Sequence, residues 1–279
     1  NNLFMINNFA FRGGGAAISD TADMTVAASY VNGFLLSFAG NCWSFDACNQ
    51  IVENLASEDN GYGGGFMVDT GGTLDISRSH ITGNRADFGT GVYIIDADSL
   101  VEMEGNLIAN NGAAAADGYT DGYAIRAYEG AALVADYLTI ADNAAVFGSI
   151  GNFQSSVTLY SSIIHDSNGI DAYDESNPVA TNMDCIIANE VASLPSLFTI
   201  IEDNPDFVDR NNGDFHINAQ TSPAVDYCDT LRADEDYYDI DNEERGWDDY
   251  VAGNNIGPFD IGFDETYEND VIFKHNIED

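Results

Sequence analysis

Short apolar segments alternate with glycine, asparagine and aspartate along the chain, and between Gly63 and Asn143 one arrangement of them occurs three times. Each occurrence contains a glycine-rich entry with a hydrophobic stretch, a second hydrophobic stretch, and a closing segment that ends in asparagine. The three sets are 63–68, 74–76 and 79–84; 89–94, 100–103 and 106–111; and 121–125, 132–134 and 137–143. None of these segments is long enough to bury its apolar side alone, so we expect the sets to stack on one another.

The isoleucines of the closing segments measure the repeat period. Neighbours in this series are 23 to 32 residues apart, and its members are Ile51, Ile81, Ile108, Ile140, Ile164 and Ile187. Such a span holds three strands of about three to five residues and three turns, which is one rung of a parallel β-helix. Leucine-rich repeats have a similar period, but their regular leucine pattern is missing. Unequal spacing fits a solenoid, because insertions enter the turns while the stacked strands keep their register.

The pattern also predicts a core and a polar ladder. Alternating positions of each strand must face the space between rungs. The predicted core residues are Val68, Leu74, Ile76, Ile81, Ile94, Leu100, Ile108, Ile125, Leu133 and Ile140. The ending Ile-x-x-Asn recurs through Asn111 and Asn143. Asparagine tolerates the left-handed backbone of a tight corner and can bond to its stacked neighbour, so we expect an asparagine ladder there.

The rungs are predicted over residues 1–190, with an insertion at about 33–49. After Pro195 the period stops, and aspartate, asparagine and glycine become frequent. Residues 191–279 are therefore expected to form an irregular capping block on the C-terminal end of the solenoid. The predicted fold class is all-β, a parallel β-helix with this block.

The chain begins inside the repeat pattern, since residues 1–8 have the character of a closing segment. The opening lacks a methionine and a basic region, so we expect a leader and upstream rungs to have been removed, or this end to be covered. The end strand would expose unpaired backbone groups. We predict that residues 1–18 are covered by upstream rungs or by a neighbouring copy, with head-to-tail addition giving a filament. The predicted self-association residues are Leu3, Phe4, Met5 and Ile6.

Four cysteines allow three disulfide connectivities. Cys42 and Cys48 lie close together within the insertion, which favours a bridge that closes this loop. A metal site is less favoured, because no second cysteine or histidine pair has ligand spacing. Cys185 and Cys228 remain as a second bridge, which would tie the last rung to the block that follows.

Charge sets this chain apart from most globular proteins. It has 47 acidic residues against 8 lysines and arginines, a formal net charge of -39. This charge indicates a strongly hydrated surface suited to extracellular fluid, and it is also compatible with collecting divalent cations. It excludes nucleic acid and anionic membranes as ligands, because eight scattered cations cannot build a basic patch. No apolar run approaches the roughly 18 residues of a membrane span.

The densest acidic run lies between Asp234 and Glu244. Hard cations take six to eight oxygen ligands, and alternating carboxylates can supply several. A calcium site is therefore predicted at Asp234, Asp236, Asp239 and Asp241. The run lacks the turn glycine of an EF-hand, and a solvated acidic loop is an equally good interpretation.

Two arrangements of charged side chains in the sequence are of a kind that catalysis uses. Arg78, His80 and Arg85 form the one basic cluster, expected at a single closing turn, as a polysaccharide lyase would need. A field of this sign would repel a polyanion, so a turn with ion pairs is favoured. Asp96 and Asp98, two apart in an extended segment, would share a face as a glycoside hydrolase requires. With so many acids, such pairs arise by chance, and the doublet at 248–249 lies outside the rungs.

A family resemblance then appears in the tail. Segments 204–209, 213–217 and 222–226, followed by Asp239-Ile240-Asp241, Arg245-Gly246 and 260–265, resemble the closing block of secreted bacterial right-handed parallel β-helix proteins. The rungs are similar to polymorphic outer-membrane-protein repeats of the pectate-lyase-like superfamily. The resemblance covers nearly the whole chain and implies a right-handed solenoid and secretion. It says little about activity, because that superfamily contains lyases, hydrolases, epimerases and adhesins.

The sequence therefore favours a secreted or cell-surface structural or adhesive module, self-assembling or binding glycans, without catalytic residues. The alternative is a polysaccharide-active enzyme. An aromatic groove with a converging acid–base pair would favour the enzyme, and flat, featureless rungs would favour the module.

Overall fold

The computed structural model describes residues 3–26, 49–56, 60–112, 122–144, 147–166, 171–229, 238–241, 243–246 and 256–266. The regular elements of these residues are short β-strands and one 3-10 turn. The insertion and the predicted Cys42–Cys48 bridge lie outside the described residues.

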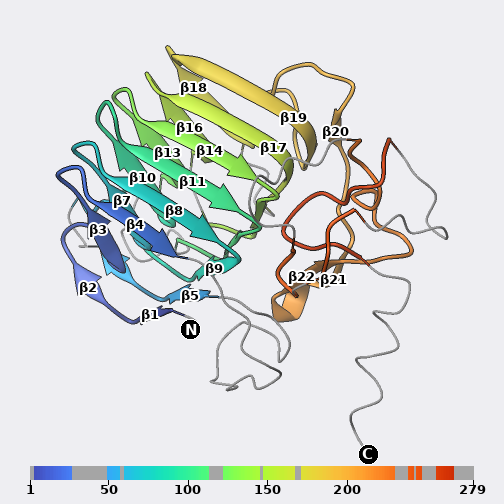
Figure 1. Ribbon diagram of the computed structural model, residues 1–279, viewed down its shortest axis with the longest axis horizontal. Helices are drawn as coiled ribbons and strands as arrows, with labels where there is room; N and C mark the ends of the chain where they lie inside the picture. Colours follow the sequence, from blue (N-terminus) through green and yellow to red (C-terminus); the bar gives the residue numbers. More distant parts are fainter. Residues whose placement is uncertain are drawn as a thin grey trace, which may run out of the picture.

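The strands form the three stacks of a parallel β-helix (Figure 1). The first stack is a six-stranded sheet of β3 (Ala16–Ile18), β7 (Phe66–Val68), β10 (Val92–Ile95), β13 (Tyr123–Tyr128), β16 (Gly148–Phe153) and β18 (Tyr173–Ser176). The second contains β4 (Asp23–Val26), β8 (Thr73–Ser77), β11 (Leu100–Glu104) and β14 (Ala132–Asp136), followed by the first halves of β17 (Ser156–His165) and β19 (Ala180–Ala188).

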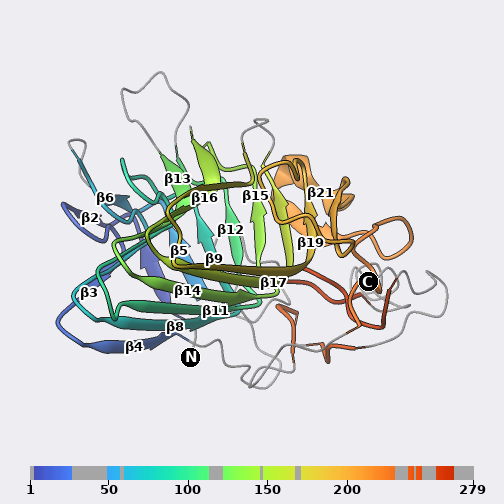
Figure 2. The ribbon, with the colours of Figure 1, turned by 90° about the horizontal axis from the view of Figure 1, so that it is seen from above.

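The third stack contains β1 (Phe4–Ile6), β5 (Asn49–Val52), β9 (Ser79–Thr82), β12 (Leu107–Ala109), β15 (Thr139–Ala141), the second halves of β17 and β19, and β20 (Ile200–Glu202). Because β17 and β19 run around a corner without a break, the second and third stacks form one twelve-stranded sheet. β2 (Phe9–Ala10) and β6 (Leu55–Ala56) make a small parallel pair. Figure 2 shows β4, β8, β11 and β14 stacked side by side.

The core runs along the inside of the three stacks. Nine of the ten predicted core residues are buried, and Leu100 is the one that was wrong. The register pairs Val101 with both Leu74 and Leu133, so Val101 and Met103 point inward while Leu100 is half-buried. A shift of one residue reverses the direction of a strand side chain, which explains the error.

The predicted asparagine ladder is present at one corner. The amide groups of each buried asparagine bond to the side-chain oxygen of the residue one rung further on, through Asn54, Asn84, Asn111, Asn143 and Asp166. The left-handed backbone falls one residue earlier than expected, for example at Asn110 and Asp142. The corner residue therefore turns the chain, and the asparagine after it binds the neighbouring rungs.

The block after residue 190 has two parts, of which the first covers the last rung. Leu194 is buried against the solenoid core, and the Ser193 hydroxyl accepts a hydrogen bond from the Tyr173 backbone. β20, also beyond residue 190, pairs parallel with β19. This part lies where the capping block was expected.

The second part packs along the side of the solenoid, which corrects the expectation that the block covers the end alone. It contains an antiparallel pair, β21 (Phe207–Asp209) and β22 (Asp214–Ile217), joined through η2 (Arg210–Asn212). Outward-facing apolar side chains of the third stack require this cover. They pack against the block and include Leu107, Ala109, Ala141, Ile163 and Ile187.

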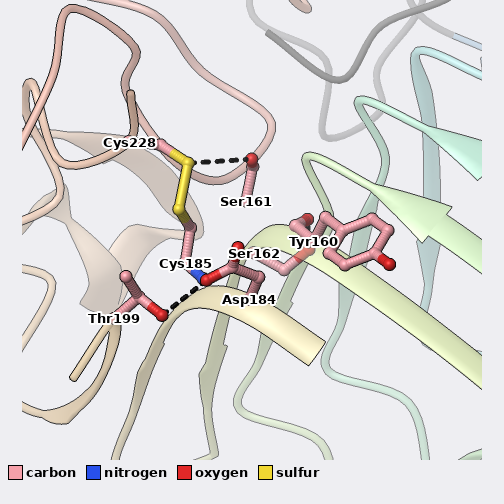
Figure 3. The surroundings of a disulfide bond; sticks show 7 residues. All are labelled: Tyr160, Ser161, Ser162, Asp184, Cys185, Thr199 and Cys228. Carbon is pink, nitrogen blue, oxygen red and sulfur yellow. Dashed lines mark hydrogen bonds between the residues drawn. A yellow bond between two sulfur atoms is a disulfide. The ribbon is translucent and has the colours of Figure 1, made fainter. Parts of the chain in front are cut away.

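One disulfide joins the solenoid to the block (Figure 3). Cys185, at a left-handed corner within β19, bonds to Cys228 with a Cα–Cα distance of 5.8 Å. The Ser161 hydroxyl, one rung earlier, lies 3.6 Å from the Cys228 sulfur. This pairing is the second bridge expected from the sequence. Among the described residues, no helix is long and apolar enough to cross a membrane.

Candidate functional site

Aromatic side chains gather around Arg126 on the outer face of the six-stranded sheet. Strand register creates this arrangement: Tyr93 of β10 pairs with Arg126 of β13, and Tyr128 pairs with Phe153 of β16. These positions alternate with core positions, so their side chains point away from the core. We call the set the Arg126 cluster, and its members are Tyr62, Phe88, Tyr93, Tyr123, Arg126, Tyr128, Phe147 and Phe153.

Arg126 joins two groups of packed rings. Tyr62 stacks on Phe88 with ring centroids 5.0 Å apart, and Tyr123 packs edge-on against Phe153 at 5.5 Å. The Arg126 guanidinium carbon lies 4.8 to 5.9 Å from five ring centroids of the two groups. These distances are within the range of cation–π attraction, so the rings hold the guanidinium in place.

The cluster is open to solvent in part. Phe147 is 57% exposed, whereas Tyr93 and Tyr123 are buried. The half-buried members are Tyr62, Phe88, Arg126, Tyr128 and Phe153. The buried rings therefore support a layer of rings that a ligand can reach.

Two tyrosine hydroxyls of the cluster remain protonated at neutral pH. Burial raises the pKa of Tyr93 to about 12. The Tyr123 hydroxyl donates a hydrogen bond to the Asp174 carboxylate at 2.5 Å. Burial is the main cause that raises the pKa of Tyr123, and this hydrogen bond raises it further. A tyrosine base would need a lowered pKa, so these hydroxyls serve as hydrogen-bond donors.

Arg126 has no carboxylate at ion-pair distance among the described residues, and its Nε makes no hydrogen bond there. Asp174 of β18 pairs with Gly151 of β16, which pairs with Arg126, so the Asp174 carboxylate lies on the same outer face of the sheet. The cluster therefore combines ring faces, a guanidinium held by rings and one carboxylate acceptor at its edge. These are the groups that bind polyhydroxylated ligands.

The basic cluster considered for a lyase is not assembled at one turn, so that expectation was wrong. Arg78 lies at the corner before β9, and Arg85 lies beyond the other end of that strand. His80, between them, is buried, with its ring centroid 6.1 Å from that of Phe263. An extended strand separates the two arginines, so their side chains belong to different corners of the rung.

The hydrolase pair was also misplaced. Asp96 and Asp98 occupy a turn between β10 and β11, with φ of 76° and 70°, not an extended segment. The Asp96 carboxylate accepts a hydrogen bond from the Thr70 backbone at 3.3 Å, which holds it to the neighbouring turn. The doublet at 248–249 lies outside the described residues.

Of the predicted calcium ligands, Asp234 and Asp236 lie outside the described residues. Asp239 is buried, and its carboxylate accepts hydrogen bonds from the backbones of Glu243 and Glu265 at 2.7 and 2.9 Å. Asp241 lies beside His216, with Oδ2 3.4 Å from the imidazole Nε2. The two described residues therefore have different surroundings, and the calcium site itself stays a prediction.

The predicted self-association residues lie in the first described rung. β1 is an edge strand, and it pairs with β5 on one side. Met5 packs against the core, while Phe4 and Ile6 point outward and are 46% and 42% exposed. Self-association through this edge stays a prediction.

The Arg126 cluster did not emerge from the sequence patterns. A signal existed in the alternation Val92-Tyr93-Ile94 and Ile125-Arg126-Ala127-Tyr128, which places large side chains outward on adjacent strands. That signal could be used only once the pairing of residue 93 with residue 126 was known.

Comparisons with known proteins address the fold. A family model described as "Right handed beta helix region" matches residues 1–144, about half of the chain. Neither the curated proteins nor the solved structures gave a match. The matched residues include the asparagine ladder through Asn143 and most strands of the Arg126 cluster. The chain therefore belongs to the right-handed β-helix family.

Proposed function

We propose that this protein is an extracellular, non-enzymatic β-helix module that attaches to neutral glycan chains through the Arg126 cluster. The observation that carries this proposal is the row of partly exposed aromatic rings around one arginine on an otherwise acidic molecule. Contiguous exposed aromatic surface of this kind marks binding sites more often than chance exposure does.

Ring faces supply the apolar part of the recognition. A pyranose presents a flat face of C–H groups, which can stack on an aromatic ring as a second ring does. Tyr128, Phe147 and Phe153 leave ring surface exposed or half-exposed for this purpose. The stacked strands place such rings on successive rungs, a repeat of about 4.8 Å, so an extended chain could lie across several of them.

Polar groups supply orientation. The Arg126 N–H groups can donate to sugar hydroxyl oxygens, and the carboxylate of Asp174 can accept from sugar hydroxyls. Because five rings surround the guanidinium, little side-chain entropy is lost when a ligand binds.

The net charge of -39 favours a neutral glycan over a polyanion, since long-range repulsion would oppose uronate-rich or sulfated chains. The same charge, together with the Cys185–Cys228 disulfide, supports an extracellular location. A protein that binds a glycan without cleaving it would have a structural or adhesive role.

The test is affinity electrophoresis in native gels that contain, one at a time, mixed-linkage β-glucan, xylan, galactomannan or polygalacturonate. We expect a neutral polysaccharide to retard the protein. Phe153→Ala should weaken the affinity that this retardation reports about fivefold, because a stacked ring contributes on the order of 1 kcal/mol. The matched control is Phe198→Ala, which removes an aromatic ring that is 85% exposed elsewhere on the molecule.

Equal retardation of the wild type and Phe153→Ala, or no retardation by any of the four polymers, would contradict glycan binding by this cluster. Product analysis of the same polymers separates module from enzyme. New reducing ends would indicate a hydrolase, and unsaturated uronates detected by ultraviolet absorbance would indicate a lyase. Either product would overturn the non-enzymatic assignment.

A further inference from the structure

A second chemically distinctive place lies within the block that packs on the side of the solenoid. His216 of β22, Asp241 of the 238–241 turn and Asp264 of the 256–266 segment come together there. One ligand atom from each, a ring nitrogen or a carboxylate oxygen, lies within 4.8 Å of the other two. His216 and Asp264 are buried, and the Asp241 side chain is 19% exposed.

The orientation of the imidazole is set by Asp214. His216 Nδ1 lies 2.6 Å from the Asp214 carboxylate, within the same strand. This contact directs Nε2 toward Asp241 and Asp264. A carboxylate on one imidazole nitrogen is the usual support for a histidine whose other nitrogen binds a metal.

The surroundings of His216 Nε2 point to a ligand. The residue is 96% buried, and Nε2 makes no hydrogen bond of acceptable geometry, although Asp241 Oδ2 is 3.4 Å away. Two ligand atoms about 2.1 Å from a tetrahedral ion lie about 3.4 Å apart, so this separation is the one that a shared metal requires.

Asp264 is held ready by a separate contact. Its Oδ2 accepts a hydrogen bond from the Ile217 backbone at 2.9 Å, which fixes the carboxylate beside the imidazole. Phe263 packs on the His216 ring at a centroid distance of 5.2 Å and shields one side of the site. Asp241 is the partly exposed member of the three, so an ion and a water ligand would reach the site past its side chain.

We propose that His216, Asp241 and Asp264 bind one divalent transition-metal ion, of the Zn²⁺ or Mn²⁺ class, that clamps three segments of the block together. The donor set selects this class, because Zn²⁺ binds both imidazole nitrogen and carboxylate oxygen and Mn²⁺ suits the two carboxylates, whereas Ca²⁺ takes oxygen ligands. The ion joins segments separated by 25 and 23 residues in the chain, 216 to 241 and 241 to 264. It stabilises a block that has few regular hydrogen-bonded strands of its own.

The test uses the full chain, stripped with EDTA and dialysed at about 0.15 M salt so that loose binding to surface acids is screened. Calorimetric titration then measures the stoichiometry and affinity for Zn²⁺, Mn²⁺ and Ca²⁺ in each variant. The Tm of each variant is measured with and without the same ions. We expect one equivalent of Zn²⁺ or Mn²⁺ to bind and to raise the Tm. Asp264→Asn should abolish this binding, and Asp214→Asn should weaken it about 10- to 100-fold.

The matched control is Asp98→Asn, the same acid-to-amide change at an exposed turn, which should leave binding unchanged. Where Asp264→Asn fails to fold, X-ray absorption of the zinc-loaded wild type gives the answer instead, because it should show one imidazole and otherwise oxygen ligands. Absence of stoichiometric binding, equal loss in Asp98→Asn, tighter binding of Ca²⁺ than of Zn²⁺ and Mn²⁺, or a zinc shell without imidazole would each overturn the proposal.

Discussion

Asp166 ends the asparagine ladder with a carboxylate where every earlier rung from Asn54 onward has an amide. It accepts hydrogen bonds from the Asn143 backbone at 2.7 Å, from the Asn143 amide at 3.1 Å and from the Ser149 hydroxyl at 2.5 Å. Burial nevertheless dominates and raises its pKa from 3.8 to about 6, with Asp142 adding to the rise. Asp166 is therefore ionised at neutral pH, although its buried position favours the neutral, protonated carboxyl group.

The consequence is a defined pH dependence. When folding raises the pKa of a carboxyl group, the folded state is favoured at any pH below the pKa of the unfolded chain. That contribution to stability is lost as pH rises through the folded-state pKa of about 6. At pH 8 the loss amounts to about 3 kcal/mol for a shift of about two units.

Asp166→Asn should remove that loss. Asparagine keeps the acceptor for Asn143, and its amide can donate to a carbonyl of an earlier rung, as Asn143 does to Ile108 at 3.0 Å. We expect the variant to be more stable than the wild type at pH 8 and the difference to shrink toward pH 4. Urea unfolding at several pH values measures this. A difference that does not change with pH, or that matches the one for Asp98→Asn, would contradict the assignment.

Strand faces determine which part of each rung can tolerate change. β12 is buried on both sides, since Ile108 faces the solenoid core while Leu107 and Ala109 face the block. β11 alternates, with Val101 and Met103 inside and Glu102 exposed. The same solenoid therefore contains strands with one protected face and strands with two.

Ile108→Asp should prevent folding, because an unpaired charge at a fully buried position costs several kcal/mol. Leu100→Asp is the matched control, since Leu100 is half-buried on the outward side of β11. Circular dichroism and thermal unfolding compare the two. A soluble, β-rich Ile108→Asp protein with the melting temperature of the wild type would refute the core assignment.

The solenoid and its block form one unit through apolar packing and a single described disulfide. Cys185 and Cys228 are 43 residues apart, so their bond closes a long loop in the unfolded chain. In the chain-entropy treatment, such a loop corresponds to about 4 kcal/mol of stabilisation.

The double variant Cys185→Ser/Cys228→Ser should therefore unfold at a clearly lower urea concentration, by up to about 4 kcal/mol in free energy. The variant isolates this bridge, whereas a reductant would act on every disulfide of the chain. An unchanged urea midpoint would mean that side packing alone holds the block in place.

The amino-acid pattern by itself determined the repeat, most of the core and the ladder. These follow from contacts between a residue and its equivalent one rung away, and a period of 23 to 32 residues shows such contacts directly. Paired isoleucines such as 163–164 and 186–187 even carried the signal that the third stack is buried on both faces. The one error in the core, Leu100, came from a register that differs by a single position.

Only the tertiary structure decided which outer faces are covered and which side chains meet on them. The Arg126 cluster gathers rings from residues 62 to 153, and the His216–Asp241–Asp264 site joins three segments of the block. The repeat places Tyr93 beside Arg126 and Tyr128 beside Phe153, but it does not specify that all these rings converge on one guanidinium, and it does not extend into the block. Their meeting depends on the exact stacking register of irregular rungs and on the docking of the block against an apolar side. Both are set by packing between distant parts of the chain, which a local pattern of apolar and polar positions does not contain.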